Sequence, residues 1–266
     1  MLKPTTIVRR PAPSLAERCE LTFVERASMS FALLERQHAA CCDALAGAGA
    51  EVMVLDADPA LPDSVFVEDT AVVLDEIAVM TRPGAASRQP ETDRIAPDVA
   101  RWRTSIERIH APGTLEGGDV LRIGRRLFVG LTTRTNAEGI AQLAAIVRPH
   151  GYVVVPVRVS GSLHLKTACT ALDAHTLLLN PAWLDVEPFA SFDRIAVAAD
   201  EPFAANVLPV NTSLIANAAF PRMLERVLGH AERVSLRTIP VDISEFGKAE
   251  AGLTCMSLVF DGSPAA

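Results

Sequence analysis

The chain contains no run of basic residues, and this absence excludes one class of partner. Its formal net charge is −7, with Lys and Arg dispersed along the sequence, so a polyanion such as nucleic acid would be repelled. A small cationic substrate would instead be weakly attracted. No window approaches the roughly 18 apolar residues of a membrane helix, and no apolar stretch at the N-terminus is long enough for a signal peptide. We therefore expect no nucleic-acid partner and no membrane partner.

The chain also lacks the cysteine patterns of secreted and zinc-binding proteins. Its five cysteines are odd in number and irregularly spaced, with no Cys-x-x-Cys pair, which argues against a disulfide framework and a zinc module. His38, Cys41 and Cys42 have a helical spacing that could mimic metal ligands, but they fall on an apolar helix face, so packing is the better interpretation. We expect a protein of the reducing cytoplasm.

What the sequence does contain is one pattern repeated five times. A polar or reactive residue opens a strand, a tight turn leads to a second strand, and a helix and a third strand follow. The copies start at Glu68, Glu116, His164, Asn206 and Cys255, in steps of 48, 48, 42 and 49 residues. A near-constant period of this length indicates a repeat architecture, in which each unit buries its apolar face against its neighbours.

The clearest copy starts at Glu116, with predicted strands at 120–123, 127–129 and 152–157. Its helix is expected to begin near Thr135, which would form a capping box with the glutamate three residues on. The apolar residues of that helix recur on one face. They are Ile140, Leu143, Ala144 and Val147.

The last copy stops after its first strand, and the N-terminal segment contains what is missing. That segment predicts a strand at 6–9, a helix with an apolar face between Phe31 and Leu45, and a strand at 51–55. Closing the last unit with the first segment would remove exposed sheet edges. We therefore predict a single catalytic domain over residues 1–266, an α/β fold built as a five-bladed β/α propeller of ββαβ repeats with pseudo-five-fold symmetry. An ordinary α/β sandwich is the alternative.

The reactive residues share one phase of this repeat. Glu68, Asp69, Glu116, His164 and Cys255 all fall at the first strand of a copy, so a ring would bring them to one central pocket. A thiol beside an imidazole suits covalent catalysis. Clustered carboxylates would keep the pKa of the thiol at or above its usual value, beside an imidazole that we expect to be neutral. Such a pocket fits a substrate with a planar, delocalised positive charge.

Two arginines also share a phase, since Arg88 and Arg134 follow the starts of their copies by 20 and 18 residues. Both would lie at one end of the ring, where they could hold a carboxylate in bidentate fashion. Asp119 is interpreted as tying down the adjacent glycine turn through bonds to its backbone. Cys169 shows no such coincidence and is interpreted as a core residue.

Eight short segments lie in order along nearly the whole chain. They are PD (62–63), FVED (66–69), TRPGAASR (81–88), LEGGD (115–119), RTN (134–136), LHLK (163–166), AAN (204–206) and LTCMS (253–257). Together they resemble the dimethylarginine dimethylaminohydrolase family of the guanidino-group-modifying superfamily. That resemblance implies the same five-bladed propeller, with no metal and no organic cofactor. It also implies hydrolysis of Nω,Nω-dimethyl-L-arginine to L-citrulline and dimethylamine.

The resemblance further implies roles for individual residues. Cys255 would be the nucleophile, His164 the general acid and base, and Glu116 the carboxylate that orients His164. The implied substrate-binding groups are three acids for the guanidinium end, two arginines for the carboxylate and two backbone carbonyls. They belong to Asp63, Glu68, Asp69, Arg88, Arg134, Leu21 and Ala249.

Two alternative functions stay open. An arginine deiminase acting on free arginine would share the cysteine, the histidine and the acids, but such enzymes usually carry an added helical segment for which this chain has no room. A catalytically silent guanidinium-binding propeller would keep the acidic pocket without needing Cys255 or His164. The sequence also leaves open whether the protein forms a homodimer.

Overall fold

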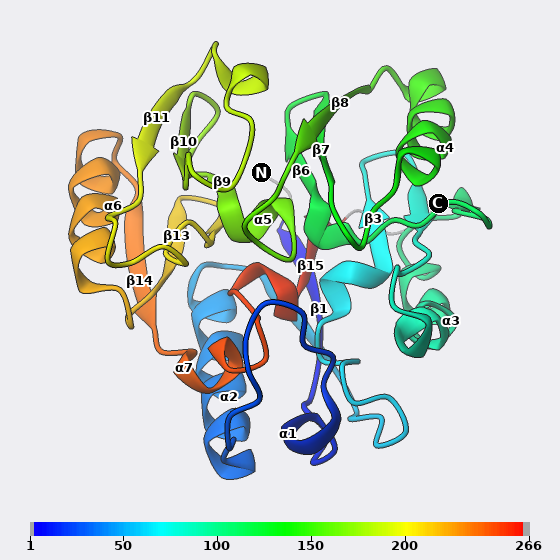
Figure 1. Cartoon of the computed structure of the whole chain (residues 1–266), viewed down its shortest axis with the longest axis horizontal. Helices are drawn as coiled ribbons and strands as arrows, with labels where there is room; N and C mark the ends of the chain where they lie inside the picture. The colour runs from blue at the N-terminus through cyan, green and yellow to red at the C-terminus, as the bar shows by residue number, and fades with distance from the viewer. Residues whose placement is uncertain (1–2, 263–266) are drawn as a thin grey trace.

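The computed structural model describes residues 3–262 and shows a ring of five three-stranded sheets (Figure 1). In every sheet one pair of strands is antiparallel and the other pair is parallel. A tight turn joins two antiparallel strands, whereas a parallel strand needs a longer crossover. The order of the predicted repeat therefore dictates this pairing, and the predicted five-bladed fold is confirmed.

Four sheets are continuous in sequence. Their strands are β3 (Ala71–Val73), β4 (Ala78–Met80) and β5 (Ile106–Arg108); β6 (Val120–Ile123), β7 (Arg126–Leu131) and β8 (Val153–Arg158); β9 (Cys169–Ala171), β10 (Thr176–Leu179) and β11 (Asp193–Ala196); and β12 (Val207–Val210), β13 (Ser213–Asn217) and β14 (Arg237–Val241).

The fifth sheet joins the two ends of the described chain. Strand β15 (Leu258–Asp261) runs antiparallel to β1 (Pro4–Arg9), and β1 runs parallel to β2 (Glu51–Leu55). Ile7 lies opposite Leu258 in this register. The N-terminal segment thus completes the last unit, as the sequence predicts.

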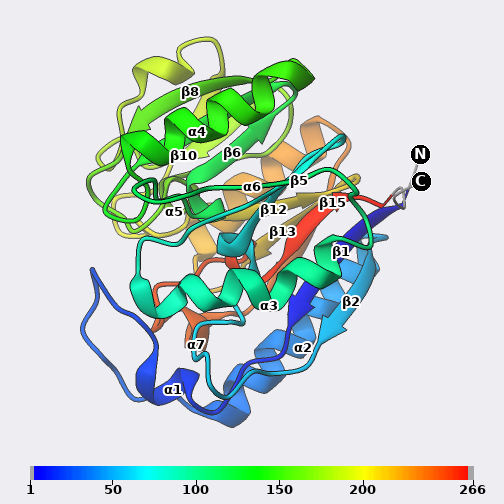
Figure 2. The same ribbon diagram turned by 90° about the vertical axis from the view of Figure 1, so that its right-hand side faces the viewer.

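Four longer helices cross from the second strand of a sheet to the third. They are α2 (Phe31–Gly47), α3 (Gln89–Val99), α4 (Ala137–Val147) and α6 (Pro221–Arg233). Figure 2 shows α3 and α4 on the outside of the ring. Leu143 of α4 belongs to one apolar cluster with Val129 of its own sheet and Val79 of the preceding sheet. The helix therefore seals the joint between two neighbouring sheets, which is how stacked repeats form a continuous core.

The shorter elements are single turns. They are α1 (Leu15–Arg18), α5 (Leu165–Ala168) and α7 (Ser244–Gly247), with the 3-10 turns η1 (Val67–Thr70), η2 (Ala86–Arg88), η3 (Gly117–Asp119), η4 (Arg148–His150), η5 (Glu187–Phe189) and η6 (Thr254–Met256).

One unit departs from the predicted pattern. Between β10 and β11 the chain forms only the turn η5, where the repeat predicts a helix. The step from His164 to Asn206 is the shortest of the four, and Pro181 and Pro188 fall within the connection, where they disfavour a helix interior. The prediction of a helix in every copy is wrong for this unit.

The start of α4 also differs from the prediction. The N-cap is Asn136, whose side chain accepts a hydrogen bond of 2.8 Å from the backbone N–H of Gly139. Thr135 instead accepts a bond of 3.1 Å from the backbone N–H of Glu116. The expected capping box is therefore wrong, because the Thr135 hydroxyl serves the neighbouring turn.

Residues interpreted as packing are found in the core. Cys169 is fully buried, and His38 and Cys41 are buried on the inner face of α2, with Cys42 partly exposed beside them. The first strands of all five sheets line a central cavity of about 290 Å³. Among residues 3–262, no helix combines the length and the apolarity needed to cross a membrane.

Candidate active site

Short turns at the starts of the repeats carry the predicted reactive residues. Turns η1, η3, α5 and η6 each stand directly before the first strand of a sheet. Glu68 and Asp69 lie in η1, Glu116 precedes η3, His164 precedes α5, and Cys255 lies in η6. Equal positions in the repeat thus become neighbouring positions in the ring.

Two glycines let these turns approach one another. A Cβ on Gly117 would lie 2.0 Å from the carbonyl oxygen of Glu68, and a Cβ on Gly118 would lie 2.6 Å from Nδ1 of His164. Neither position has room for a side chain. The glycine pair therefore brings η3 into contact with both η1 and the catalytic candidate His164.

A narrow cavity beside these turns is lined by seven of the ten predicted site residues. They are Asp63, Asp69, Arg88, Arg134, His164, Ala249 and Cys255. Glu116 stands directly behind His164. Leu21, which is partly buried, is next in sequence to Glu20, another residue of the cavity wall. Glu68 lines the central cavity instead.

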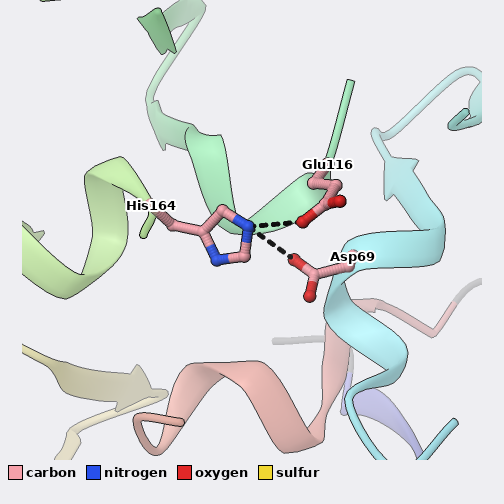
Figure 3. A group of neighbouring side chains, drawn as sticks. All are labelled: Asp69, Glu116 and His164. Atoms are coloured by element: carbon pink, nitrogen blue, oxygen red, sulfur yellow. Dashed lines mark hydrogen bonds and ion pairs between the residues drawn. The ribbon is translucent and has the colours of Figure 1, made fainter. Parts of the chain in front are cut away.

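One ring nitrogen of His164 faces two carboxylates that come from different turns (Figure 3). Its Nε2 is 2.6 Å from Oε2 of Glu116 and 3.8 Å from Oδ1 of Asp69. Burial by itself would lower the pKa of His164, but the carboxylates of Asp69, Glu116 and Asp119 outweigh it and raise that pKa to about 9. The imidazole is therefore protonated at neutral pH, and the expectation of a neutral His164 is wrong.

Glu116 is the partner of this imidazolium. Burial would raise the pKa of the fully buried carboxyl, but the hydrogen bond and charge of His164, with the charges of Arg88 and Arg134, lower it to about 2. Glu116 and His164 thus form an ion pair, and Glu116 fixes the ring orientation of the proton donor.

The Cys255 thiol is buried, with 6% of the residue exposed. Its Sγ accepts a hydrogen bond of 3.3 Å from the backbone N–H of Gly252. Burial raises the pKa of Cys255, and the negative charges of Glu68 and Asp69 raise it further. The thiol is therefore protonated in the empty site, in the direction that the sequence predicts.

Arg88 is already occupied inside the protein. Its Nη1 is 2.7 Å from Asp69 and its Nη2 is 2.9 Å from Glu91, while Nη2 also donates to the carbonyl of Phe66 at 3.2 Å. Burial would lower the pKa of Arg88, but Glu91, Asp69 and Glu116 raise it well above its usual value. Arg88 chiefly neutralises the buried acids of the site.

Arg134 has an unused donor. Its Nη2 donates to the hydroxyl of Thr22 at 3.1 Å, and its Nη1 is 3.6 Å from Oε1 of Glu116. That Nη1 is buried and has no hydrogen-bond partner within residues 3–262. A buried donor without an acceptor is destabilising by roughly 1–3 kcal/mol. An anionic ligand group in the cavity would satisfy it.

Acidic side chains hold the segment around Leu21 over the cavity. Both carboxylate oxygens of Asp63 accept from the backbone N–H of Glu20, at 3.2 and 3.1 Å. The carboxylate of Glu250 accepts from the N–H of Thr22 at 2.9 Å. Burial raises the pKa of Asp63, against the opposing effect of Arg88.

Glu68 is directed toward the central cavity, which it lines. Its Oε1 is 2.5 Å from Nζ of Lys166, and its Oε2 accepts from the hydroxyl of Thr254 at 2.8 Å. Burial raises the pKa of Glu68, and Lys166 opposes that effect. Glu68 does not line the cavity that contains Cys255. The interaction with a guanidinium expected of Glu68 would therefore be the long-range attraction of its negative charge, without direct contact.

Three functional neighbours were missed by the sequence reasoning. Lys166 stands two residues after His164 within the LHLK segment, so its position was a usable signal. Glu91 follows Arg88 by three residues, the spacing of an ion pair on one helix face. Glu250 carries no sequence signal, because the segment around it has no distinctive pattern.

Asp69, Glu116 and His164 place one ligand atom each within 4.8 Å of one another, which is the geometry of a candidate metal site. Their charges are already balanced by partners. Arg88 pairs with Asp69, and the imidazolium of His164 pairs with Glu116. A divalent cation would have to displace both interactions, so this donor set fits a proton-transfer site better than a metal centre.

Comparison with known proteins agrees with this geometry. A family model described as arginine deiminase matches residues 21–234. The chain belongs to this family. It is 38% identical over 255 residues to the N(G),N(G)-dimethylarginine dimethylaminohydrolase of Pseudomonas aeruginosa, covering 96% of this chain and 98% of that protein. It is 42% identical over 254 residues to the protein of the same name from Streptomyces coelicolor, covering 95% of each.

A solved structure of the Pseudomonas aeruginosa enzyme, a cysteine-to-serine variant complexed with citrulline, superposes with a TM-score of 0.91 at 38% identity. It covers 98% of this chain and all of that one. A histidine-to-glycine variant of a dimethylarginine dimethylaminohydrolase, an adduct with S-methyl-L-thiocitrulline, superposes with a TM-score of 0.90 at 37% identity and the same coverage.

Proposed function

We propose that the chain hydrolyses Nω,Nω-dimethyl-L-arginine to L-citrulline and dimethylamine, and Nω-monomethyl-L-arginine to L-citrulline and methylamine. One observation carries this proposal. The thiol of Cys255 lines the same buried cavity as an imidazolium, His164, which is held by Glu116 at 2.6 Å. The near-full-length likeness to two enzymes named for this reaction supports the choice of substrate.

In the first half of the reaction, the Cys255 sulfur loses its proton to solvent and bonds to the central guanidinium carbon. The bond from that carbon to the dimethylamino nitrogen then breaks, and His164 donates its proton to the departing dimethylamine. A pKa of about 9 suits this step, because it keeps His164 protonated at neutral pH. A covalent thiouronium remains on Cys255.

In the second half, His164 is neutral and accepts a proton from a water molecule. The water oxygen bonds to the thiouronium carbon and the carbon–sulfur bond breaks. The remaining proton of the former water passes to the departing sulfur, so citrulline leaves and the Cys255 thiol is regenerated. One imidazole thus acts first as an acid and then as a base. Asp63 and Asp69 face the guanidinium end, Glu68 adds negative field from behind, and the carbonyls of Leu21 and Ala249 complete the wall.

We also propose that residues 1–266 form a single catalytic domain and that the protein works in the cytoplasm. The pairing of β15 with β1, which joins the two ends of the ring, supports one domain. The five cysteines are free, which fits a reducing compartment.

Product analysis tests the proposed reaction. Purified protein is incubated separately with arginine, monomethylarginine and dimethylarginine, and citrulline and the released amine are measured. We expect citrulline from the two methylated substrates. Turnover of arginine alone would favour a free-arginine enzyme, and no turnover of any substrate would favour a silent guanidinium-binding propeller.

The unpartnered donor of Arg134 predicts how the substrate carboxylate is held. Arg134→Ala should raise KM for methylarginine by roughly 10- to 100-fold, the effect of losing a charged hydrogen bond, with a smaller change in kcat. Agmatine-type substrates, which lack the carboxylate, should be poor. The matched control is Arg158→Ala, on an exposed residue of β8. Equal use of both substrate types by the unmutated enzyme would show that Arg134 has another function.

The raised pKa of Cys255 predicts activation by the substrate. The empty enzyme should show little thiolate at neutral pH, because burial and the charges of Glu68 and Asp69 disfavour the anion. A bound guanidinium supplies positive charge, so the pKa of the thiol should fall on binding. Titration of the thiolate ultraviolet absorbance, with and without an inert cationic ligand and with Cys255→Ser as the blank, measures both states. A thiolate already present at pH 6 and unaffected by the ligand would contradict this account.

A further inference from the structure

Asp119 makes contacts that the proposed chemistry does not use. The sequence suggests that it ties down the adjacent glycine turn, but that turn is closed by a backbone bond of 3.0 Å from the N–H of Asp119 to the carbonyl of Glu116. The Asp119 carboxylate, which is fully buried, reaches out of its own turn. Oδ1 accepts a bond of 2.9 Å from the backbone N–H of Leu165, the residue after His164.

The second carboxylate oxygen of Asp119 is bonded to the loop that carries Arg134. Oδ2 of Asp119 accepts a bond of 2.8 Å from the hydroxyl of Thr132. The Thr132 oxygen in turn accepts from the backbone N–H groups of Arg134 and Thr135, each at 3.1 Å. One carboxylate is therefore bonded to the turn that carries His164 and, through the hydroxyl of Thr132, to the loop that carries Arg134. A side-chain hydrogen bond with Thr135 of the same loop also favours its anion.

The negative charge of Asp119 also affects His164, in addition to the hydrogen bonds of its carboxylate. Within residues 3–262 it has no Lys or Arg ion pair, and its bonding partners are neutral N–H and O–H groups. Burying a carboxylate in this way is destabilising, and a neutral side chain could make a purely structural tie. Burial raises the pKa of Asp119 to about 6, against the charge of His164. The carboxyl is therefore ionised at neutral pH and acts on the imidazole.

We propose that Asp119 is a positioning residue that holds His164 and Arg134 in register across the cavity. This inference rests on the proposed function, since it assigns Arg134 to the substrate carboxylate and His164 to the leaving amine. Those two groups bind opposite ends of one substrate. A misplacement of either by about 1 Å lowers the rate by roughly 10²-fold. A carboxylate bonded to both segments keeps the distance between His164 and Arg134 constant.

The test is the nearly isosteric substitution Asp119→Asn. Its amide oxygen can still accept from Leu165, but its NH₂ group would face the Thr132 oxygen, which already accepts two N–H bonds. We expect the loop carrying Arg134 to shift, with kcat lower by about 10- to 100-fold and KM higher by several-fold. The carboxylates of Asp69, Glu116 and Asp119 act on His164, and Arg88, Arg134 and Cys255 line the same cavity. Loss of one of the three carboxylates should lower its titration midpoint by about 1 pH unit.

The titration of His164 is followed by NMR in the empty protein, so it does not depend on turnover. If the protein proved to have another activity, this measurement would still decide whether Asp119 acts on His164. Thr132→Val removes the bond from Thr132 to Asp119 and the acceptor of the Arg134 N–H, and keeps the bond from Thr135. It should raise KM while leaving the His164 titration unchanged. Thr132→Ser keeps the hydroxyl, so its KM should be close to that of the unmutated enzyme.

The matched control is Asp173→Asn in another unit. Asp173 accepts from the backbone N–H groups of His175 and Thr176 and pairs with His230, outside the cavity wall. The Asp173→Asn substitution should lower the stability of the protein and leave the His164 titration, kcat and KM unchanged. An Asp119→Asn enzyme that is less stable but has normal His164 titration, kcat and KM would overturn the proposal. If that variant fails to fold, an unchanged KM in Thr132→Val overturns it instead.

Discussion

Cys255→Ser should lower kcat by at least about 10³-fold, the scale seen when a nucleophile is removed from an enzyme that acts through a covalent intermediate. A serine hydroxyl is a far weaker nucleophile than a thiolate, and the negative charges of Glu68 and Asp69 oppose its ionisation further. The fold should remain intact, because serine is smaller than cysteine and can accept the same bond from Gly252. Steady-state citrulline formation measures the loss, and circular dichroism checks the fold.

The control for this substitution is Cys169→Ala, which changes a buried thiol in the core of another sheet. It should be somewhat less stable and keep nearly all of its activity. Mass spectrometry of acid-quenched enzyme should find the transient adduct on the peptide that contains Cys255. Full activity in Cys255→Ser, or an adduct on any other cysteine, would end the assignment of the nucleophile.

His164→Gly should separate the two proton transfers. With dimethylarginine, turnover should fall by about 10²- to 10⁴-fold, because the amine must receive a proton as it leaves. S-methyl-L-thiocitrulline carries a thiol leaving group, which departs as an anion without a donor. With that compound the variant should form the covalent adduct on Cys255 and then stall, because no base remains to activate water. Intact-protein mass spectrometry follows the adduct over time.

A matched control is His150→Ala, in the turn η4 and outside the cavity wall. It should behave like the unmutated enzyme with both substrates. The solved adduct of a histidine-to-glycine relative with S-methyl-L-thiocitrulline is in line with this expectation. Rapid turnover of either substrate by His164→Gly would show that another group transfers the protons.

The repeat and the residues that carry the chemistry could be predicted from the sequence. Most units have local signals, namely a polar start, a turn and a helical apolar face, and these recur with a near-constant period that predicts a ring. The same period brought Cys255, His164 and Glu116 to one place, because equal phases in a closed ring share one height. The predicted helix between β10 and β11 failed only where the period itself was shorter, at 42 residues.

The tertiary structure alone decided which groups are paired and how they are charged. Arg88 and Arg134 look alike in sequence, yet buried acids pair with Arg88, while one N–H group of Arg134 has no hydrogen-bond acceptor among the described residues 3–262. Glu68 and Asp69 are adjacent, yet they face different cavities. The protonated state of His164 depends on three carboxylates from two turns. Pairing, burial and charge state depend on distances between distant segments, and periodicity carries no information about distances of a few ångströms.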